Sequence, residues 1–210
     1  MFVRNYMSSD PVTISLGTPI LEALNIMKKQ KIRQLPVVEK GKLMGVVSER
    51  ELLTVTPSPA TTLSIYEMNY LLAKMVVKEV MAKNPITIEP VCSLEEAALI
   101  MRDNKIGSLL VVDGGKLVGI ITQTDIFDAL IKVFGFRKAG TRIVVETTDR
   151  TGALAELLQI VKEFDINLVG VACIEKVDRK VDIMLRLGTA EPGPVVDRIK
   201  ERGYNVESIS

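Results

Sequence analysis

Residues 119–125 read Gly-Ile-Ile-Thr-Gln-Thr-Asp, and this stretch decides the fold. Its first three residues are typical of the end of a buried strand, and Thr122 is a good N-cap for a helix that follows at once. A helix N-terminus presents unpaired N–H groups and favours anions such as phosphate. Asp125 lies three residues later, where its carboxylate could accept hydrogen bonds from both hydroxyls of a ribose. The same spacing also forms a capping box without any ligand, and on these seven residues alone the capping interpretation is stronger.

The chain repeats itself at an offset of 74 residues. Residues 45–51 read Gly-Val-Val-Ser-Glu-Arg-Glu, and residues 3–53 align with residues 77–127 without a gap. An internal repeat of this length indicates two copies of one structural unit. Among the recurring pairs are Met7 and Met81, Pro11 and Pro85, Thr13 and Thr87, and Ile14 and Ile88.

Length and composition narrow the class of protein. The 210 residues leave room for two or three small domains, and 47% hydrophobic but 4% aromatic residues predict a small aliphatic core. A net charge of +1 creates no extended electrostatic field around the protein, so we expect neither a nucleic acid nor a membrane as partner. Residues 1–5 lack the apolar stretch of a signal peptide, and no run approaches the ~18 apolar residues of a spanning helix. These features predict a cytoplasmic protein.

The chain contains no histidine. This excludes Ser-His-Asp and Cys-His nucleophile arrangements and any metal site with a histidine ligand. Cys92 and Cys173 lie far apart in the sequence, and we expect buried thiols rather than a disulfide, as in a reducing compartment. We therefore predict a protein that is not an enzyme, without catalytic residues, metal or catalytic cofactor.

The sequence of each copy predicts the element order β-α-β-β-α. A unit of roughly fifty residues is too small to be stable alone, so the two copies are expected to pack face to face and share a core. In the second copy, Ser93 and Glu96 have the spacing of a capping box. In the first copy the predicted elements are a strand at 11–14, a helix capped by Thr18 with Pro19 at its first position, strands at 34–39 and 43–47, and a helix from Ser48.

With this repeat, element order and strand-end motif, residues 1–134 resemble a CBS-domain pair, also called a Bateman module. The resemblance implies a regulatory module that binds AMP, ADP, ATP or S-adenosylmethionine between the two copies. It also implies that the Ser or Thr at the strand end contacts the phosphate of the nucleotide and that the Asp contacts its ribose. A Thr early in the unit is implied to flank the base. Carried over to the second copy, the implied nucleotide site is Thr87, Gly107, Ser108, Leu109, Thr122 and Asp125.

The first copy departs from the family pattern, because Glu51 stands where Asp is expected. The longer carboxylate would have to retract to reach a ribose, so this second site is predicted to be weaker. Arg33 and Arg50 could touch a phosphate there, although exposed arginines are more often solvated surface charges. The residues implied for the weaker site are Thr13, Gln34, Leu35, Ser48, Arg50 and Glu51.

Between the copies, residues 56–62 form a proline-bearing loop, and Ser64 is a predicted helix cap. The helix after it has a buried stripe, expected to pack on the CBS pair or across a dimer; its residues are Ile65, Met68, Leu71, Leu72 and Met75.

Residues 141–210 predict the order β-α-β-β-α-β, which is the ferredoxin-like plan. Together with Asp-Arg-Thr-Gly-Ala-Leu at 149–154, this order resembles an ACT domain, although Thr151 stands where that family usually has Pro. The resemblance implies an amino acid as ligand, or dimerisation alone. The implied ligand contacts are Asp149, Arg150, Thr151, Gly152, Ala153 and Asn167.

The full-length order of domains resembles the acetoin-utilisation B-type proteins of bacteria. The predicted fold class is therefore α/β (α+β), with boundaries at 1–56, 57–76, 77–134, 135–140 and 141–210. One functional hypothesis is a non-catalytic sensor of adenine nucleotides, acting as a homodimer on an unidentified target protein. The alternative is a structural dimerisation or scaffold subunit whose ligand sites are vestigial.

Overall fold

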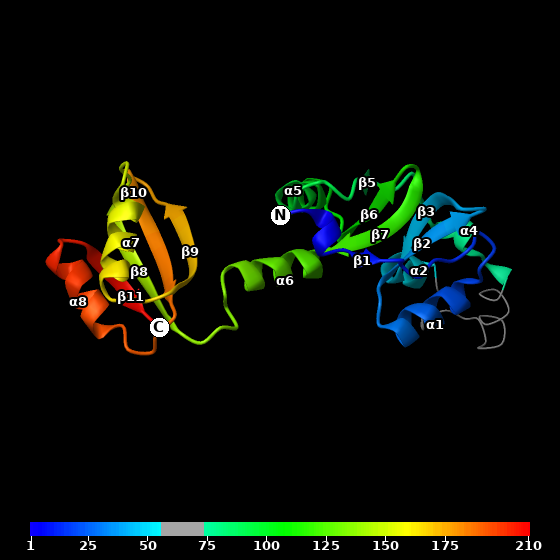
Figure 1. The fold of residues 1–210 in the computed structure, drawn as a ribbon. Helices are drawn as coiled ribbons and strands as arrows, with labels where there is room; N and C mark the ends of the chain where they lie inside the picture. The colour runs from blue at the N-terminus through cyan, green and yellow to red at the C-terminus, as the bar shows by residue number, and fades with distance from the viewer. Residues whose placement is uncertain (56–73) are drawn as a thin grey trace. The chain divides into compact units, whose positions relative to one another are not determined.

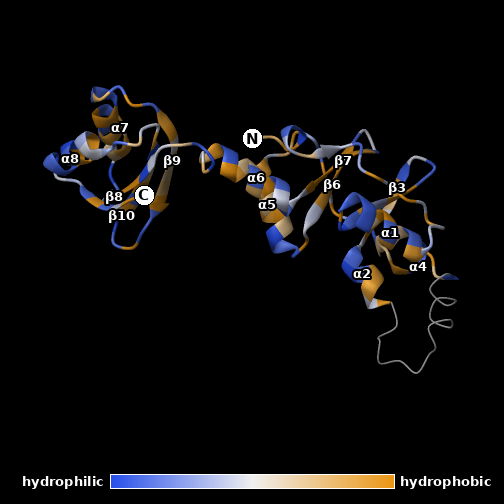
Figure 2. Ribbon diagram, turned by 90° about the horizontal axis from the view of Figure 1, so that it is seen from below, coloured by the Kyte–Doolittle hydropathy of each residue, from blue (hydrophilic) through white to orange (hydrophobic). Residues whose placement is uncertain are grey.

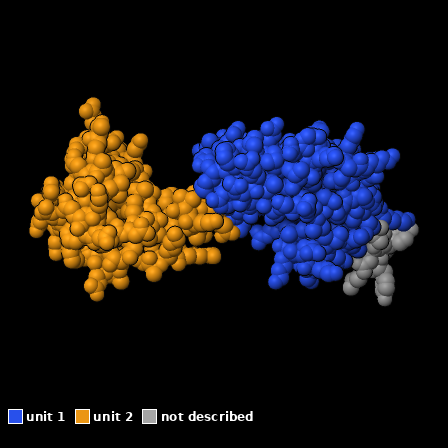
Figure 3. All heavy atoms as spheres, viewed as in Figure 1, with its two compact units in different colours: residues 1–126 blue, residues 127–210 orange. Residues whose placement is uncertain are grey.

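The structure, a computed structural model, describes residues 1–55 and 74–210. It divides into two compact units, residues 1–126 and residues 127–210, which Figure 3 shows in two colours. The boundary falls within helix α6 (Gln123–Val133). The predicted loop at 56–62 and most of the predicted apolar stripe, Ile65 to Leu72, lie outside the described residues. No helix in the described part of the chain has the length and apolar character needed to span a membrane.

Unit 1 contains both copies of the repeat (Figure 1). The repeat is visible in the backbone itself, because Asp10 and Asn84 share a left-handed conformation, with φ of 50° and 56°. Lys31 and Lys105 do the same, with φ of 55° and 54°. The first copy consists of η1 (Val3–Asn5), β1 (Ser8–Ser9), α1 (Ile20–Gln30), β2 (Gln34–Glu39), β3 (Lys42–Ser48) and α2 (Glu49–Thr54), and the second of α4 (Val77–Val80), β4 (Ala82–Lys83), β5 (Thr87–Ile88), α5 (Leu94–Asp103), β6 (Ser108–Asp113), β7 (Lys116–Thr122) and α6.

The two copies exchange their first strands. One sheet has the order β1-β7-β6-β5 and the other β2-β3-β4, so β1 of the first copy joins the second copy's sheet and β4 makes the reverse exchange. Ser8 pairs with Ile120, and Gly45 pairs with Lys83. The segments before these strands cross over as well: the N–H of Val3 donates to the carbonyl of Cys92 at 2.9 Å. The sheet of each copy is therefore completed by a strand from the other copy.

The glycine of each strand-end motif lies where an exchanged segment makes a close approach. A Cβ atom on Gly119 would lie 2.6 Å from the sulfur of Met7, and one on Gly45 would lie 2.5 Å from the carbonyl oxygen of Ala82. Contacts this short do not occur for real Cβ atoms. The motif therefore has glycine at this position because a side chain there would collide with the segment that crosses over from the other copy.

Helix starts differ in detail from the predictions. Helix α1 begins at Ile20 with Pro19 as its N-cap, because the Thr18 side chain instead accepts a hydrogen bond from the N–H of Ser15 at 3.1 Å. Ser93 accepts from the N–H of Glu96 at 3.0 Å, as in half of a capping box. The Glu96 carboxylate accepts from the thiol of Cys92 at 3.4 Å. The buried residues of α1 and α5 have the spacing of one helical face; they are Ile20, Ala23 and Met27, and Leu94, Ala97 and Met101.

Unit 2 has a four-stranded antiparallel sheet with the order β11-β8-β10-β9 and two helices packed on one face. In the sequence, Val181, Ile183, Leu185 and Leu187 alternate with Asp182, Met184 and Arg186, which predicts a strand with one buried and one open face. The first four residues are indeed buried against these helices. Met184 was expected on the opposite, open face, yet it is also buried, with 7% of its surface exposed. The elements are β8 (Thr141–Thr148), α7 (Ala153–Glu163), β9 (Leu168–Glu175), β10 (Lys180–Leu187), α8 (Gly193–Glu201) and β11 (Asn205–Ile209).

Candidate functional site

Both strand-end motifs form the same hydrogen bonds. The N–H and the hydroxyl of Thr122 donate to Oδ2 of Asp125 at 2.7 and 2.8 Å. The N–H and the hydroxyl of Ser48 donate to Oε2 of Glu51 at 2.7 and 2.8 Å. The longer Glu51 side chain thus folds back onto its cap, as its position in the motif requires. The capping interpretation holds in both copies, and it leaves the second carboxylate oxygen of Asp125 without a bond inside this motif.

The Thr122–Asp125 motif lines a cavity of about 710 Å³ in unit 1. The second copy contributes the start of β6, part of β7 and the first turn of α6, while the first copy contributes the end of β1 and the start of β2. The exchanged strand β1 thereby brings first-copy residues to the second-copy motif. The wall consists of residues 8–12, Lys31, Ile32, Arg33, Gln34, Pro36, Gly107, Ser108, Ile120 and residues 122–125.

Four of the six residues predicted for the main site, Gly107, Ser108, Thr122 and Asp125, line this cavity. The other two lie elsewhere. Leu109 points into the core with 1% of its surface exposed, and Thr87 lies exposed on β5, where it pairs with Leu110.

Several wall residues had not been predicted, among them Pro11, Val12, Ile32 and Pro36. The repeat pattern assigns each early strand to its own copy, so no sequence signal showed that the strand before residue 11 crosses to the other one. These four residues contribute apolar surface to the wall, in contrast to the polar Thr122–Asp125 turn.

Of the residues predicted for the weaker site, Gln34 alone lines the described cavity. Ser48, Arg50 and Glu51 lie together at the start of α2, whereas Thr13 is exposed and Leu35 is fully buried. The equivalent residues Gln34 and Ser108 meet at the cavity wall, where the Ser108 hydroxyl donates to the amide oxygen of Gln34. Each of them also pairs across its own hairpin with a motif residue, Gln34 with Ser48 and Ser108 with Thr122.

In unit 2, the turn predicted to contact an amino acid already contains an internal ion pair. Arg150 donates to both carboxylate oxygens of Glu156 at 2.7 and 2.6 Å, and the hydroxyl of Tyr204 also donates to Glu156. The hydrogen bonds from Arg150, followed by the one from Tyr204, lower the pKa of Glu156 to about 2. The guanidinium of Arg150 is therefore occupied by a carboxylate of its own chain.

The remaining residues of that predicted site are spread along the turn and the next loop. Asp149, Thr151 and Asn167 are exposed, and Ala153 is buried at the start of α7. Gly152 is the N-cap of α7 and has a φ of 91°, a left-handed conformation that favours glycine. The Asn167 carbonyl accepts from the N–H of Gly188 at 2.8 Å, so this residue has a structural role in the loop before β9.

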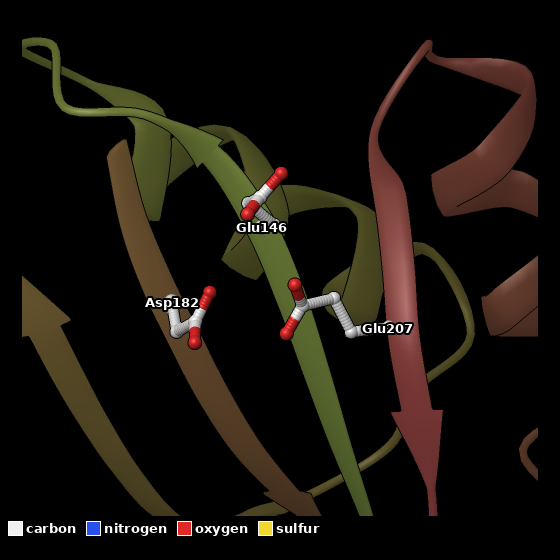
Figure 4. Close-up of side chains that lie close together, drawn as sticks. All are labelled: Glu146, Asp182 and Glu207. Atoms are coloured by element: carbon white, nitrogen blue, oxygen red, sulfur yellow. The ribbon is translucent and has the colours of Figure 1, made fainter. Parts of the chain in front are cut away.

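Three carboxylates gather on the open face of the unit 2 sheet. Glu146, Asp182 and Glu207 extend from the neighbouring strands β8, β10 and β11, as Figure 4 shows. The ammonium group of Lys176 lies 2.9 Å from an oxygen of each one. Hydrogen bonds to Asp182, Glu146 and Glu207 raise the pKa of Lys176. The cluster is therefore an internal ion network with a lysine at its centre.

The cysteines differ from the prediction in burial. Both are free thiols, but Cys173 is exposed and Cys92 is half-buried. Partial burial and the contact with Glu96 raise the pKa of the Cys92 thiol to about 11, which disfavours the reactive thiolate.

Comparison with known proteins identifies the family. Residues 3–57 and 77–132 match the CBS domain family, and the chain therefore belongs to it. A CBS domain-containing protein of Dictyostelium discoideum is 36% identical over 135 residues, which is 63% of this chain and 93% of the relative. The CBS region of inosine-5'-monophosphate dehydrogenase also matches: the enzyme of Korarchaeum cryptofilum is 28% identical over 164 residues, but the chain spans only 31% of its length.

Several solved structures also resemble part of this chain. The AMP complex of CBSX2 from Arabidopsis thaliana is 28% identical, with a TM-score of 0.53 over 63% of this chain and 97% of that one. The CBS pair of protein MJ0100, solved with 5-methylthioadenosine and S-adenosylmethionine, is 27% identical, with a TM-score of 0.52 over 62% and 99%. A Vibrio cholerae protein named for acetoin utilization is 30% identical, with a TM-score of 0.54 over 65% and 95%.

Proposed function

We propose that this protein is a non-catalytic regulator that binds an adenine nucleotide, AMP, ADP or ATP, in the cavity of its CBS pair. The observation that carries the proposal is the cavity wall, which combines apolar residues with a helix N-terminus and an available carboxylate oxygen. Adenine requires a flat apolar slot, ribose a hydrogen-bond acceptor and phosphate a donor-rich, positive surface. That structures of relatives are described as complexes with AMP or S-adenosylmethionine supports the same class of ligand.

Within the cavity, each part of the nucleotide has a matching group. Pro11, Val12, Ile32 and Pro36 supply the apolar surface for the base. The second carboxylate oxygen of Asp125 accepts from the ribose, because the first is held by Thr122. The N-terminus of α6, an eleven-residue helix, faces the phosphate end. Binding regulates a target protein only if the nucleotide prefers one conformation of the pair over another.

Unit 2 is proposed to be an ACT domain on the ferredoxin-like plan. The order β11-β8-β10-β9 with two helices on one face supports this plan. An amino acid ligand at the turn 149–153 would have to displace Glu156 from Arg150, since the ion pair between them is bidentate. This favours a structural or dimerising role for unit 2, with an amino acid as an additional ligand only if it outcompetes Glu156.

The experiment that tests the nucleotide proposal is thermal denaturation with ligand. AMP, ADP or ATP at 100 times its dissociation constant should stabilise the folded chain by about 2.7 kcal/mol. S-adenosylmethionine belongs in the same series, because a relative's structure contains it. If none of the four ligands shifts the melting temperature or produces heat in calorimetry, the scaffold alternative is correct and the sites are vestigial.

The target and the pathway require a separate measurement. The likeness to a protein named for acetoin utilization makes enzymes of that pathway the first candidates. A pull-down with the full chain, performed with and without AMP, should recover a partner whose binding changes with the nucleotide. A partner retained equally in both conditions would support a scaffold.

A further inference from the structure

We propose that unit 2 binds a phosphate group between Arg142 on β8 and Arg186 on β10, on the face of its sheet that the helices leave open. This site is separate from the cavity of unit 1 and from the turn at 149–153. Its ligand is a compact oxyanion, either inorganic phosphate or the phosphate group of a small molecule.

The two arginines lie directly opposite each other on neighbouring strands, and both are half-buried. Ile143 and Leu185, the residues next to them, are buried against the helices, so both arginines lie on the open face. The N–H and the carbonyl of Arg142 are both bonded to Ser210, on the β11 side, which makes Arg142 and Arg186 a non-hydrogen-bonded pair. In such a pair the Cα atoms are only about 4.5 Å apart, and like charges are destabilising.

Neither guanidinium has an acidic partner within residues 1–55 and 74–210. The Arg186 side chain donates one hydrogen bond there, from Nη1 to the carbonyl of Lys138 at 3.3 Å. Its Nε is buried and has no hydrogen-bond partner in the same part of the chain. An oxyanion at the edge formed by Nε and Nη2 would supply the missing acceptor through two parallel hydrogen bonds.

An acidic pair on the same two strands shows how this sheet accommodates like charges that face each other. Glu146 lies opposite Asp182 on the open face (Figure 4), and the ammonium group of Lys176 lies 2.9 Å from an oxygen of each. Glu146 is four residues from Arg142, roughly 13 Å along β8, and no ion pair joins the two pairs in the described residues. The arginine pair therefore lacks a counter-ion equivalent to Lys176, and a bound anion would take that role.

The linker between α6 and β8 lies against Arg186 and adds positive charge. A Cβ atom on Gly135 would lie 3.6 Å from Cδ of Arg186, and the carbonyl of Lys138 accepts from the same side chain. Residues 134–140 include Arg137 and Lys138, both exposed, and no acidic residue. The linker therefore surrounds the arginine pair with cations and supplies no carboxylate.

The number of donors favours phosphate over a carboxylate. A carboxylate has two oxygens, and one guanidinium already engages both of them in a bidentate pair. A phosphate group has a third oxygen and carries roughly 1.5–2 negative charges near neutral pH, so it can bind both arginines and match their charge. Free phosphate and a phosphate ester share this chemistry, and their relative affinities distinguish the two sources.

The test is calorimetric titration of the full chain with inorganic phosphate, glycerol 3-phosphate and acetate in chloride buffer at constant ionic strength. The wild-type chain should bind phosphate or its ester at least tenfold more tightly than acetate. Tighter binding of the ester would assign the site to a phosphorylated small molecule, and tighter binding of inorganic phosphate to the free ion. Arg142→Gln should weaken binding of the preferred ligand at least tenfold.

Amide hydrogen exchange locates the bound ion. Phosphate should slow exchange at the start of β8 and at the end of β10, near Arg142 and Arg186. Protection confined to unit 1 would overturn the site, because it would place the phosphate in the other compact unit.

A matched control is Arg179→Gln, which makes the same charge change on an exposed residue at the opposite end of β10. It should leave phosphate affinity unchanged within twofold. Without ligand, Arg142→Gln should melt no lower than the wild-type chain, since it removes the repulsion with Arg186. Loss of binding in this variant would then reflect the lost site and not a lost fold.

Three results would contradict the proposal. Absence of phosphate binding in chloride buffer, or an equal loss in Arg142→Gln and Arg179→Gln, would overturn the site. Acetate binding as tightly as phosphate would overturn the chemical class. None of these results depends on whether unit 1 binds a nucleotide.

Discussion

Gln34 and Ser108 occupy the same position in the two copies of the repeat, 74 residues apart, and the hydroxyl of Ser108 donates a hydrogen bond to the amide oxygen of Gln34. Both residues begin the first strand of their hairpins and pair with the helix cap of their own copy. This side-chain contact at the cavity wall therefore links the two hairpins that carry the strand-end motifs.

This contact should be measurable as a coupling energy. Ser108→Ala and Gln34→Ala should each lower the free energy of unfolding by about 0.5–1.5 kcal/mol, as expected for a typical internal hydrogen bond. The double variant should lose less than the sum, because both changes remove the same bond. Urea denaturation of the four proteins measures the cycle, and strictly additive losses would show that the bond contributes nothing to stability.

Nucleotide affinity should depend much more on Asp125 than on Glu51. Asp125 lines the cavity, and loss of a hydrogen bond to its charged carboxylate should cost roughly 1.5–3 kcal/mol of binding. Glu51→Ala removes the equivalent cap from α2 and serves as the matched control. Calorimetry with AMP gives both affinities, and the melting temperatures without ligand correct for the lost caps. Equal losses of affinity in the two variants would refute the ranking of the two sites.

The strand exchange predicts a graded series of glycine substitutions. Gly45→Ala should destabilise unit 1 by about 1–3 kcal/mol, because the new Cβ would lie 2.5 Å from the backbone carbonyl of Ala82. Gly119→Ala should cost less, since its shortest contact is the flexible side chain of Met7. Gly17 has no atom within 4 Å of a built Cβ, so Gly17→Ala should be close to neutral. Thermal denaturation gives the order, and a neutral Gly45→Ala would contradict it.

Acid should destabilise unit 2 through its ion network. Hydrogen bonds from Lys180 and then Lys176 lower the pKa of Glu146 from 4.5 to about 2. A carboxyl group whose folded pKa is depressed contributes stability above its unfolded pKa, and this contribution is lost as the pH falls towards the folded value. The melting temperature should therefore fall between pH 4.5 and pH 2, and Glu146→Gln should flatten that fall.

A suitable control for the acid experiment is Glu191→Gln. Glu191 is an exposed carboxylate of the same unit, outside the ion pairs of the described residues. The pH dependence of this variant should match that of the wild-type chain. An unchanged slope in Glu146→Gln would mean that the Lys176 network does not stabilise the fold.

We also expect a homodimer. Strand β9 is an edge of the unit 2 sheet, and Ile174 on it is 55% exposed. Helix α6, whose hydrophobic residues are orange in Figure 2, carries exposed apolar side chains, among them Phe127 with 62% of its surface exposed. A second copy related by two-fold symmetry can pair with the open strand edge and cover the apolar side chains. Light scattering at micromolar concentration should give about twice the monomer mass of 23.1 kDa, and a monomeric mass would refute the dimer.

The sequence predicts the hairpins and main helices of unit 1, because their signals are local, whereas the strand expected at 11–14 is reduced to one bridge between Ile14 and Val37. Thr122 and Ser48 cap the helices expected of them, since a side-chain oxygen and the N–H three residues later are fixed by short-range geometry. The lengths of the strands follow from their apolar runs, as with β2 and β6. These features need no knowledge of how the copies meet.

The cavity could be predicted only in part, because its wall depends on the exchange of strands between copies. Thr87 repeats Thr13 in the sequence, and the resemblance to the CBS family implied that Thr87 lies in one site with Thr122. In the structure it is Pro11 and Val12 of the other copy that line the cavity with Thr122. Strand pairing between distant segments is set by backbone hydrogen bonds and close glycine contacts, and neither leaves a periodic signal in the sequence. For the same reason the burial of Met184 was missed, since period-two alternation reports one covered face only.

The exchanged strand also bears on how the protein is made. Ser8 leaves the ribosome early, yet its partner Ile120 is synthesised roughly 100 residues later, on the order of 5–20 s at typical elongation rates. Until residues 82–83 have also been made, the first hairpin has an open edge at Gly45, with no β4 to cover it. Unit 1 is therefore expected to fold only after the second hairpin emerges, and until then the open edge of its first half can pair with another nascent chain.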